Sequence, residues 1–583
     1  MSTPRATLWP ELGGRISARG GVRYPPVETQ PAKAGEMQRR GPGSSPAGKA
    51  GGKVGATGLL ALAVAHHRGG RLGEAAALYR KIPARDAGYP DALHLLGLIE
   101  HASGRHLQAL ALIERAIGLR DGIAAYHVAR SVVLSALDRA GEAEAAAGRA
   151  LVLAPEDAEA LNALGIARMR QGDAEAAAGC HRRALAARPA FAEAANNLGV
   201  AFRGQARLGE AEAALREAIR LRPGYASAHA NLGLVLQDLG RYAEALTSFD
   251  EAVAADAAHP AAHGNRAMLL LLLGRLEEGF AEYEWRWRMP GFATPRRDFP
   301  QPEWDGGLLP GGTVLVHAEQ GLGSAIQFVR YAQAVAERCG RLVLECQPPL
   351  ARLFRQSLAA PEGPVAEVIV KGEPLPGFDR HVPLMSLPYR LGTTATSIPA
   401  AVPYLRAAAD DIERWSRRLR DPACVAGAPP LRVGLVWAGN RQHENDANRS
   451  MPPAALAPLL GCPGARFFSL QVPADPAGLD VMGDRVTDLA GQLSDFADTA
   501  ALMQSLDLVI SVDTAAAHLA GALGRPAWVL LPYIPEWRWQ LDRADSPWYP
   551  TVRLFRQQAP GDWHGVVRSV AAALAASVAE RAG

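Results

Sequence analysis

From residue 56 to about residue 258, small and apolar positions recur every 34 residues. The alanine that marks this period most clearly stands at Ala75, Ala109, Ala143, Ala177, Ala211 and Ala245. A glycine and a proline keep the same spacing over three units, at Gly165, Gly199 and Gly233 and at Pro155, Pro189 and Pro223. Small residues at fixed places let two antiparallel helices approach closely, and proline ends the second helix. The pattern therefore predicts six helical hairpins and a degenerate seventh, which begins near His259 and ends by Met289.

Beyond residue 310 the pattern changes, because short β-branched or apolar runs alternate with helical segments. The expected strands are residues 313–316, 341–345 and 365–370, then, after a charged helix at 410–420, residues 431–437, 467–470, 506–511 and 527–531. Strands that alternate with helices predict parallel sheets covered on both faces. The two groups of strands suggest two Rossmann-like halves that face a cleft, at residues 294–425 and 426–583.

The 34-residue period, with its small residues and terminal proline, resembles the tetratricopeptide repeat. The resemblance implies a superhelix of stacked hairpins over residues 56–293, so we expect an all-α solenoid followed by an α/β module. Residues 1–55 are rich in glycine, proline, alanine and arginine and show no apolar periodicity. They are expected to form a disordered basic tail.

Charge is unevenly distributed along the chain. The formal net charge is +3, but residues 1–55 hold nine Arg or Lys and three Glu, so the remainder is slightly acidic. This balance argues against nucleic-acid binding by the folded part. Only Lys371 lies beyond Lys81 among the lysines, so an anion site in the second half has to use arginine, histidine or backbone amides.

Hydropathy and cysteine content bear on the compartment. The 583 residues contain no run of 18 apolar residues and no basic-then-apolar leader, so we expect neither a membrane span nor a secretory signal. The five cysteines form no C-x-x-C pair, which disfavours both a disulfide framework and a zinc site. A cytoplasmic protein without a metal is the expectation.

The first candidate for chemistry is the segment from Asp513 to His518, which passes from a predicted strand into a helix. Ligands of doubly wound sheets bind at the carboxyl ends of strands, where helix N–H groups face anions. Small residues after Thr514 leave room for a diphosphate. The alternative is that Asp513 only caps the helix and His518 only packs within it.

Four segments together resemble a known group of enzymes: His317 to Phe328, Val433 to Asn440, Ser511 to His518 and Asp545 to Pro550. They resemble bacterial fusions of tetratricopeptide repeats to a glycosyltransferase, with a C-terminal part similar to the heptosyltransferase superfamily. The layout is similar to that of the O-linked N-acetylglucosamine transferases. The resemblance implies a GT-B fold and an inverting, metal-independent transfer from a nucleotide sugar, with no further cofactor.

The resemblance also implies which residues bind the donor. Asp513, Thr514 and His518 match contacts to the diphosphate and sugar. The first strand and loop of the donor half contribute Trp437, Gly439 and Asn440, while Gln471 is expected to contact the nucleotide and Arg449 the leaving diphosphate.

Two positions depart from the family pattern. The Gly-Leu-Gly motif is normally followed by an aspartate proposed as the general base, and here Ser324 stands there. A neutral hydroxyl is no base near neutral pH without an activator, so His317 or Glu319 could take that role. The loop after Asn440 usually carries a lysine, and Glu444 lies in that loop instead, which is unfavourable beside a diphosphate.

The loop around Gly321 and Gly323 is not a dinucleotide fingerprint, because Ile326 replaces its third glycine. It is either a tight strand-to-helix turn or, together with Gln320, a contact for the acceptor.

Asparagines in the repeats suggest a surface for a partner. Asn197, Asn231 and Asn265 are 34 residues apart, and Asn162 and Asn196 form a neighbouring pair. A carboxamide both donates and accepts, so such a ladder could hold a peptide backbone. A similar ladder lines the concave face in the O-linked N-acetylglucosamine transferases. The alternative is that each asparagine satisfies only local backbone.

Two hypotheses about function follow. The first is a glycosyltransferase whose repeats recruit a protein or peptide acceptor. The second, motivated by Ser324 and Glu444, is a protein-interaction scaffold with a degenerate transferase module.

Overall fold

The computed structural model describes residues 56–289, 291–292, 294–420, 429–442 and 445–582. The described residues form two compact units, divided between Ala257 and Ala258. The basic tail expected at residues 1–55 and the loop position Glu444 lie outside the described residues.

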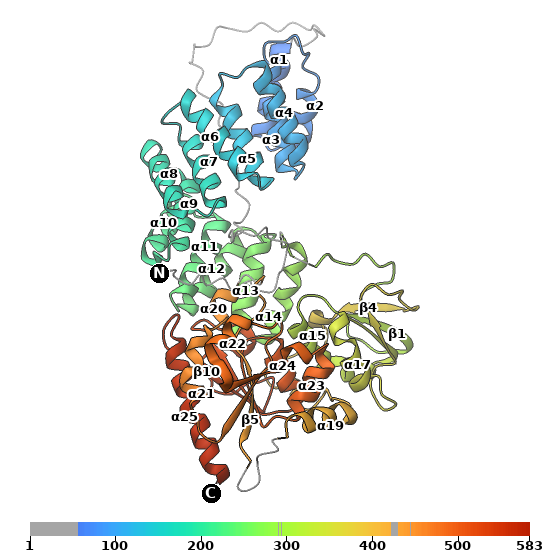
Figure 1. Ribbon diagram of the computed structural model, residues 1–583. Coiled ribbons are helices and arrows are strands. Elements are labelled where there is room, and N and C mark those ends of the chain that lie inside the picture. Colours follow the sequence, from blue (N-terminus) through green and yellow to red (C-terminus); the bar gives the residue numbers. More distant parts are fainter. Residues whose placement is uncertain (1–55, 290, 293, 421–428, 443–444, 583) are drawn as a thin grey trace, which may run out of the picture. The chain divides into compact units, whose positions relative to one another are not determined.

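The first unit is a series of six helical hairpins, coloured from blue to green in Figure 1. They are α1 (Ala56–Arg68) with α2 (Leu72–Tyr79), α3 (Tyr89–Ala102) with α4 (His106–Leu119), α5 (Ala124–Ala136) with α6 (Ala140–Leu153), α7 (Ala158–Arg170) with α8 (Ala174–Ala187), α9 (Ala192–Gly204) with α10 (Leu208–Leu221), and α11 (Ala226–Asp238) with α12 (Tyr242–Ala255). The solenoid predicted from the 34-residue period is confirmed.

The periodic glycines let a large side chain of the second helix pack against the first. A Cβ atom added at Gly199 would lie 2.5 Å from Leu215 Cγ, and one at Gly233 would lie 2.5 Å from Phe249 Cε1. The large partners are themselves 34 residues apart. At the equivalent place in an earlier hairpin, Ser131 replaces the glycine and the partner is Ala147. Room on one helix is thus matched to side-chain volume on the other.

The second unit contains two sheets in which every strand pairing is parallel. The smaller has the order β3 (Glu367–Val370), β2 (Cys339–Cys346), β1 (Leu309–His317), β4 (Arg380–Pro383). The larger has the order β10 (Val552–Arg556), β9 (Ala527–Leu531), β8 (Leu508–Val512), β5 (Leu431–Val436), β6 (Ala465–Ser469), β7 (Val486–Asp488). The predicted α/β module is confirmed. The strands that the sequence did not reveal, β4, β7 and β10, all lie at sheet edges, where a short and partly polar strand is tolerated.

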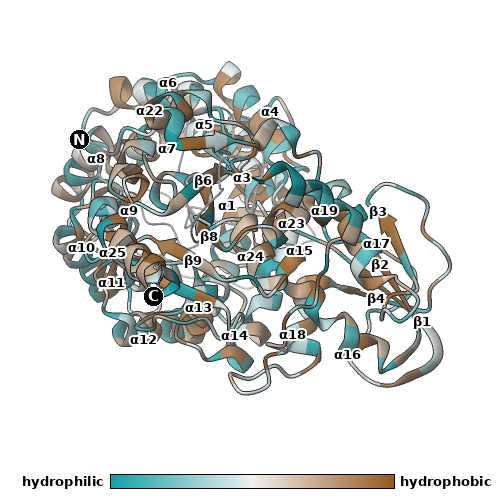
Figure 2. Ribbon diagram, turned by 60° about the horizontal axis from the view of Figure 1, so that its bottom comes forward, coloured by the Kyte–Doolittle hydropathy of each residue, from teal (hydrophilic) through white to brown (hydrophobic). Residues whose placement is uncertain are grey.

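Helices pack against the strands, such as α17 on β3 and α16 on β2. In Figure 2 strand β3 is largely brown, which marks apolar residues, and helix α19 is largely teal. The helices of this unit are α13 (Pro260–Leu272), α14 (Leu276–Tyr283), α15 (Leu322–Phe328), α16 (Ala332–Ala336), α17 (Ala351–Leu358), α18 (Leu387–Arg390), α19 (Ala409–Arg418), α20 (Asp446–Arg449), α21 (Ala457–Leu460), α22 (Pro476–Met482), α23 (Phe496–Gln504), α24 (Ala515–Ala522) and α25 (Trp563–Ala582). None of the helices in the described ranges is long and apolar enough to cross a membrane.

The seventh hairpin, α13 with α14, falls in the same compact unit as the two sheets. Phe280 of α14 meets Phe328, Trp537 and Trp548 edge to face, with ring centroids 5.7–6.4 Å apart. Phe280 is therefore surrounded by aromatic side chains of both halves of the module.

We expect Gly199→Ala to destabilise the helical unit by about 1–3 kcal/mol, because the new methyl group overlaps Leu215. Leu215→Ala alone should cost about 2–5 kcal/mol, and the double variant less than the sum by at least about 0.5 kcal/mol. Urea unfolding of the four proteins measures this coupling. Gly209→Ala is the control, since nothing lies within 4 Å of a Cβ there. Additive effects would mean that the glycine is not matched to the leucine.

Candidate functional site

The order of the larger sheet identifies where a ligand is expected. Its strands run outward in both directions from β5 and β8, which are neighbours. In doubly wound sheets, ligands bind outside the carboxyl ends of the strands at this point of reversal. The residues that follow β5 begin at Trp437, and those that follow β8 begin at Asp513. The topology thus brings the two sequence-predicted donor segments together.

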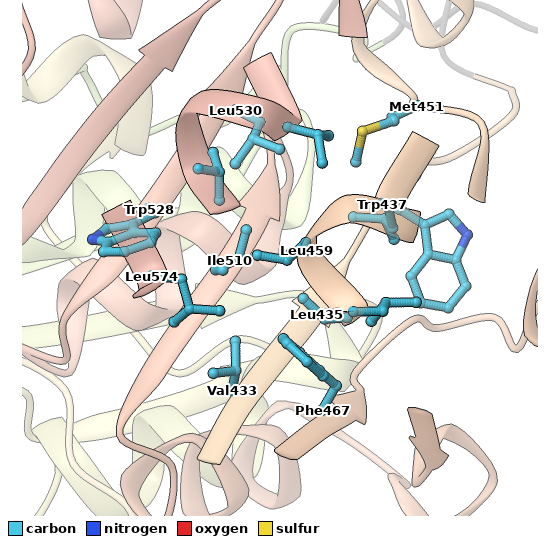
Figure 3. Close-up of a cluster of buried hydrophobic side chains, with 14 of the residues drawn as sticks. Val433, Leu435, Trp437, Met451, Leu459, Phe467, Ile510, Trp528, Leu530 and Leu574 are labelled. Atoms are coloured by element: carbon cyan, nitrogen blue, oxygen red, sulfur yellow. The ribbon is translucent and has the colours of Figure 1, made fainter. Parts of the chain in front are cut away.

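The loop after β5 begins with a side chain that packs into the hydrophobic core. Trp437 is 1% exposed and lies at the rim of the core cluster, with its indole nitrogen pointing away from it (Figure 3). That nitrogen donates to Asp475 Oδ2 at 3.0 Å. Trp437 therefore anchors the loop and is buried in the described structure.

Gln471, which the resemblance assigns to the nucleotide, is buried at the end of β6. Its Oε1 accepts from the amides of Trp437 and Ala438 at 3.2 and 3.0 Å, and its Nε2 donates to the Ala438 carbonyl at 3.0 Å. Both ends of the carboxamide thus hold the backbone of the neighbouring loop.

Further along this loop, Gly439 leaves room for charged neighbours. An added Cβ would lie 2.6 Å from Asp446 Oδ1 and 2.7 Å from Arg449 Nη2, so a side chain would displace both. Arg449 Nη1 donates to the Asp513 carbonyl at 3.2 Å and so links the loops after β5 and β8. Asn440 is exposed, and its Oδ1 accepts from the Gln442 amide at 3.0 Å.

After β8, Thr514 is the N-cap residue of α24 and its side chain makes no capping bond. Its hydroxyl lies 3.0 Å from Ser511 Oγ instead. Asp513 is 8% exposed. The helix terminus carries a partial positive charge, which suits a phosphate group.

His518 is buried in α24, with Nδ1 3.0 Å from the Tyr549 hydroxyl and its ring stacked on Trp539. Burial holds its pKa well below 6.5, and the charges of Arg538, Arg330 and Arg449 lower it further. The imidazole is therefore neutral at pH 7. The surrounding field is positive, which favours an anionic ligand.

The loop between β1 and α15 meets α24. A Cβ at Gly323 would lie 3.0 Å from His518 Cδ2 and 3.5 Å from Ala515 Cα, so glycine lets α15 and α24 lie side by side (Figure 1). Gly321 has no neighbour within 4 Å of an added Cβ. The half of the module expected to receive the acceptor thus touches the predicted donor helix.

Gln320 has a φ of 60°, which is uncommon outside glycine. Three hydrogen bonds hold this conformation. Its amide donates to Thr294 Oγ1 at 3.3 Å, its carbonyl accepts from Gln347 Nε2 at 3.0 Å, and its side-chain Nε2 donates to the Tyr283 hydroxyl at 2.7 Å. The last contact comes from the seventh hairpin.

The three candidate bases have different surroundings. His317 is buried with Nε2 3.3 Å from His381 Nδ1, and burial, followed by the charge of His381, lowers its pKa to about 3. Ser324 is buried, and its Oγ accepts from Arg538 Nη2 at 2.9 Å. Neither a neutral imidazole of such low basicity nor a hydroxyl beside a guanidinium is matched to proton removal at pH 7.

Glu319 differs from both. It is 1% exposed, and burial raises its pKa to about 7 against the opposing effect of Arg286, whose Nη2 donates to Oε1 at 2.8 Å. Its Oε2 has no hydrogen-bond partner within the part of the chain that the structure describes. A carboxylate with a pKa near neutrality fits general base catalysis.

Sequence reasoning missed the buried arginines. Arg286 and Arg538 are 0% and 1% exposed, and each is the centre of a Trp-Arg-Trp tripeptide. Arg330 is buried too and donates to the Trp548 carbonyl at 2.7 Å. The repeated tripeptide was the available signal, because a guanidinium stacks on flanking indoles when it is buried, at 4.5 Å in both cases.

The asparagines of the repeats bond to one another. Asn197 donates to Asn162 at 3.0 Å, Asn196 donates to Asn197 at 3.2 Å, and Asn231 donates to Asn196 at 2.8 Å. The described solenoid thus contains a continuous chain of carboxamides, which occupies part of their bonding capacity. Asn265 lies on α13, in the other unit. Among the described residues, no group of three or more His, Cys, Asp and Glu side chains could hold a metal ion.

Comparisons with known proteins agree with both parts of this architecture. The tetratricopeptide repeat model matches residues 49–90, 163–226 and 231–284, and the model of glycosyltransferase family 9 (heptosyltransferase) matches residues 476–558. Protein FlbA of Caulobacter vibrioides is 28% identical over 318 residues, which are 51% of this chain and 52% of FlbA. The chain thus spans about half the length of the curated relative it matches.

Solved structures similar to this chain include a tetratricopeptide repeat protein from Parabacteroides merdae, with 17% identity and a TM-score of 0.33, covering 39% of this chain and 91% of that one. The APC/C hetero-tetramer Cut9-Hcn1 shows 22% identity and a TM-score of 0.35, covering 37% and 43%.

The class of protein is therefore a tetratricopeptide-repeat solenoid joined to an α/β module. More particularly, the segment from α22 to just beyond β10 is similar to the heptosyltransferases, and this match supports glycosyltransferase activity in general. Both parts of the resemblance seen in the sequence are confirmed.

We expect Gln471→Met to lower the free energy of unfolding by about 2–4 kcal/mol, because two backbone donors and one backbone acceptor of the loop after β5 lose their hydrogen-bond partner. Calorimetric unfolding measures this change. Gln492→Met is the control, since Gln492 is exposed. Equal stability of the two variants would contradict a structural role for Gln471.

Proposed function

We propose that the chain is a glycosyltransferase of GT-B type that transfers a sugar from a nucleotide-sugar donor to a protein or peptide acceptor recruited by the repeats. The observation that carries this proposal is the junction of the loops after β5 and β8 by Arg449, at the reversal point of a sheet whose C-terminal part is similar to the heptosyltransferases.

In the proposed donor site the diphosphate lies at the N-terminus of α24. Asp513, Thr514 and His518 surround it from β8 and α24, and Gly439 and Asn440 approach it from the loop after β5. Positive charge there comes from Arg449, from the helix terminus and from the field of Arg538 and Arg330, so the departing diphosphate is stabilised without a metal. This arrangement uses no lysine, in keeping with the composition of this half.

In the proposed reaction, Glu319 removes the proton from the acceptor nucleophile. The nucleophile attacks the anomeric carbon of the donor sugar, the bond to the diphosphate oxygen breaks, and the diphosphate leaves with the electron pair. Attack on the face opposite the leaving group inverts the configuration. The raised pKa of Glu319 supports this choice over His317 and Ser324, as does the lack of a hydrogen-bond partner for its Oε2 among the residues that the structure describes.

The repeats are proposed to recruit the acceptor, because tetratricopeptide repeats commonly form extended surfaces for protein partners. The carboxamide chain of Asn162, Asn196, Asn197 and Asn231 is the proposed contact. A carboxamide can form more hydrogen bonds than those that join these asparagines, so peptide groups can bond to it as well. On the second unit, Asn265, Gln320, Gly321 and Gly323 are the proposed acceptor contacts.

The second candidate function is a scaffold whose module no longer transfers a sugar. The observation in its favour is that Ser324, in place of the family's aspartate, is bonded to Arg538. A nucleotide-binding measurement separates the two, since a scaffold needs no donor site.

We expect Arg449→Gln to weaken nucleotide binding by about 10- to 100-fold, because a charge-assisted hydrogen bond contributes about 1.5–3 kcal/mol. Calorimetric titration with UDP, GDP, ADP and CMP measures the affinity of the best ligand. Arg568→Gln removes an exposed arginine of α25 and should leave it unchanged. Absence of binding by the unchanged protein would instead favour the scaffold.

We expect the rate of sugar transfer to rise with pH through about 7 and then to level, because Glu319 accepts a proton only when ionised. Glu319→Gln should reduce the rate at pH 7.5 by at least about 100-fold. His317→Gln is the matched control, because His317 is the last residue of β1, two residues before Glu319. A rate that follows His317 and ignores Glu319 would assign the base differently.

A further inference from the structure

Arg286 lies at the centre of a cluster of polar side chains that is buried except at Glu284. It follows α14 in η1 (Glu284–Arg288) and is 0% exposed. Its Nη1 donates to Glu284 Oε1 at 2.6 Å, and its Nη2 donates to Glu319 Oε1 at 2.8 Å and to Ser386 Oγ at 2.7 Å. Ser386 Oγ in turn donates to Glu284 Oε1 at 2.8 Å. One guanidinium is therefore shared by two carboxylates.

The members of this cluster come from three parts of the second unit. Glu284 and Arg286 belong to the segment that closes the seventh hairpin, Glu319 lies in the loop between β1 and α15, and Ser386 lies in the turn that follows β4. Tyr283 of α14 also accepts from Gln320 in that loop. The end of the hairpin thus determines where this loop and its carboxylate lie.

The charges in the cluster do not balance. Glu319 is almost completely buried, while the Glu284 side chain is 20% exposed, and a single cation lies between them. Burial is the largest cause of the raised pKa of Glu319; Arg286 opposes it, and the charge of Glu284 adds to it. Two carboxylates that share one cation cannot both be fully stabilised as anions.

We propose that Arg286 and Glu284 are positioning residues for Glu319, so that the closing segment of the repeats is part of the reaction site of the transferase module. The inference rests on the proposed function, because it gives Glu319 the role of base. Arg286 holds Oε1 and leaves Oε2 for the acceptor, and Glu284 competes for the same guanidinium. Transfer then depends on residues outside both Rossmann-like halves.

The two neighbours have opposite effects on the same proton. With Glu284→Gln, Arg286 serves Glu319 alone, so Glu319 should titrate about one pH unit lower. With Arg286→Lys, the planar guanidinium that donates to both carboxylates is lost and the positive charge is held less closely, so Glu319 should titrate at a higher pH. If Glu284 and Arg286 only supported the fold, replacing them would not shift the titration of Glu319 in these two opposite directions.

The test uses the full chain and begins without any ligand. Infrared difference spectra recorded against pH follow the carbonyl stretch of the protonated carboxyl, and the band that disappears in Glu319→Gln belongs to Glu319. We expect its midpoint to fall in Glu284→Gln and to rise in Arg286→Lys. Arg288→Lys is the matched control, because Arg288 is an exposed arginine of the same segment. Midpoints that do not move, or that move together, would overturn the inference.

The second readout is release of nucleotide from UDP-, GDP-, ADP- and CMP-sugars. At pH 6, Glu284→Gln should release nucleotide about fivefold faster than the unchanged protein, because a larger fraction of Glu319 is ionised. Nucleotide affinity, measured by calorimetry, should be the same in all variants. If Arg286→Lys does not fold, the test is made with Glu284→Gln alone, because glutamine preserves the shape of the glutamate side chain.

The outcomes separate the two proposals. If no nucleotide binds and none is released, the proposed function fails, whatever the infrared midpoints show. If nucleotide is released but the pH profile is the same in Glu284→Gln and the unchanged protein, only the positioning role fails. Release that is unaffected by Glu319→Gln overturns the role of Glu319 and the inference with it.

Discussion

The α/β unit depends on the burial of arginine between its two halves. Arg538, which is 1% exposed, reaches from the loop after β9 to Ser324 of α15, while Glu536 of its own loop balances its charge at 2.6 Å. A buried guanidinium without such partners would cost several kcal/mol, so the contacts have to form together. The loops at the carboxyl ends of both sheets are held in place by this requirement.

A second clamp acts farther along the same interface. Arg352 of α17 donates to both carboxylate oxygens of Asp495, the N-cap residue of α23, each at 2.7 Å. It joins the two halves through a partly exposed, bidentate pair, which gives geometric specificity as well as energy. The halves are therefore held by one buried and one partly exposed charged contact. The packing of α15 on α24 adds a third contact, in which small uncharged residues approach closely.

The chemistry of the module is shaped by its scarcity of lysine, since Lys371 is the only one in residues 294–583. Where a lysine would bring a compact charge to a phosphate, this chain offers arginines that are also structural, so positive potential and folding are coupled. Burial and, after it, the charges of Arg538, Arg330 and Arg449 lower the pKa of His518 and keep it neutral. Glu319 is the exception in this positive region, since burial and the nearby charge of Glu284 oppose the stabilising effect of Arg286 and bring its pKa to about 7.

Much of the fold follows from the sequence alone. The 34-residue period fixed the hairpins because each glycine has to be matched by a large partner one helix away, and apolar runs revealed the central strands because those are buried on both faces. The edge strands β4, β7 and β10 escaped, since a strand paired on one side needs no such run. The sequence also placed Trp437 and Asp513 at the ends of strands in the same predicted half. Only the tertiary structure decided the hydrogen-bond partners of the buried polar side chains. Gln471 bonds to the backbone of a neighbouring loop, Ser324 bonds to Arg538, and Glu319 shares Arg286 with Glu284. These partners are up to 214 residues apart, and no local pattern encodes them, because a pKa or a hydrogen bond depends on distance in space and on burial.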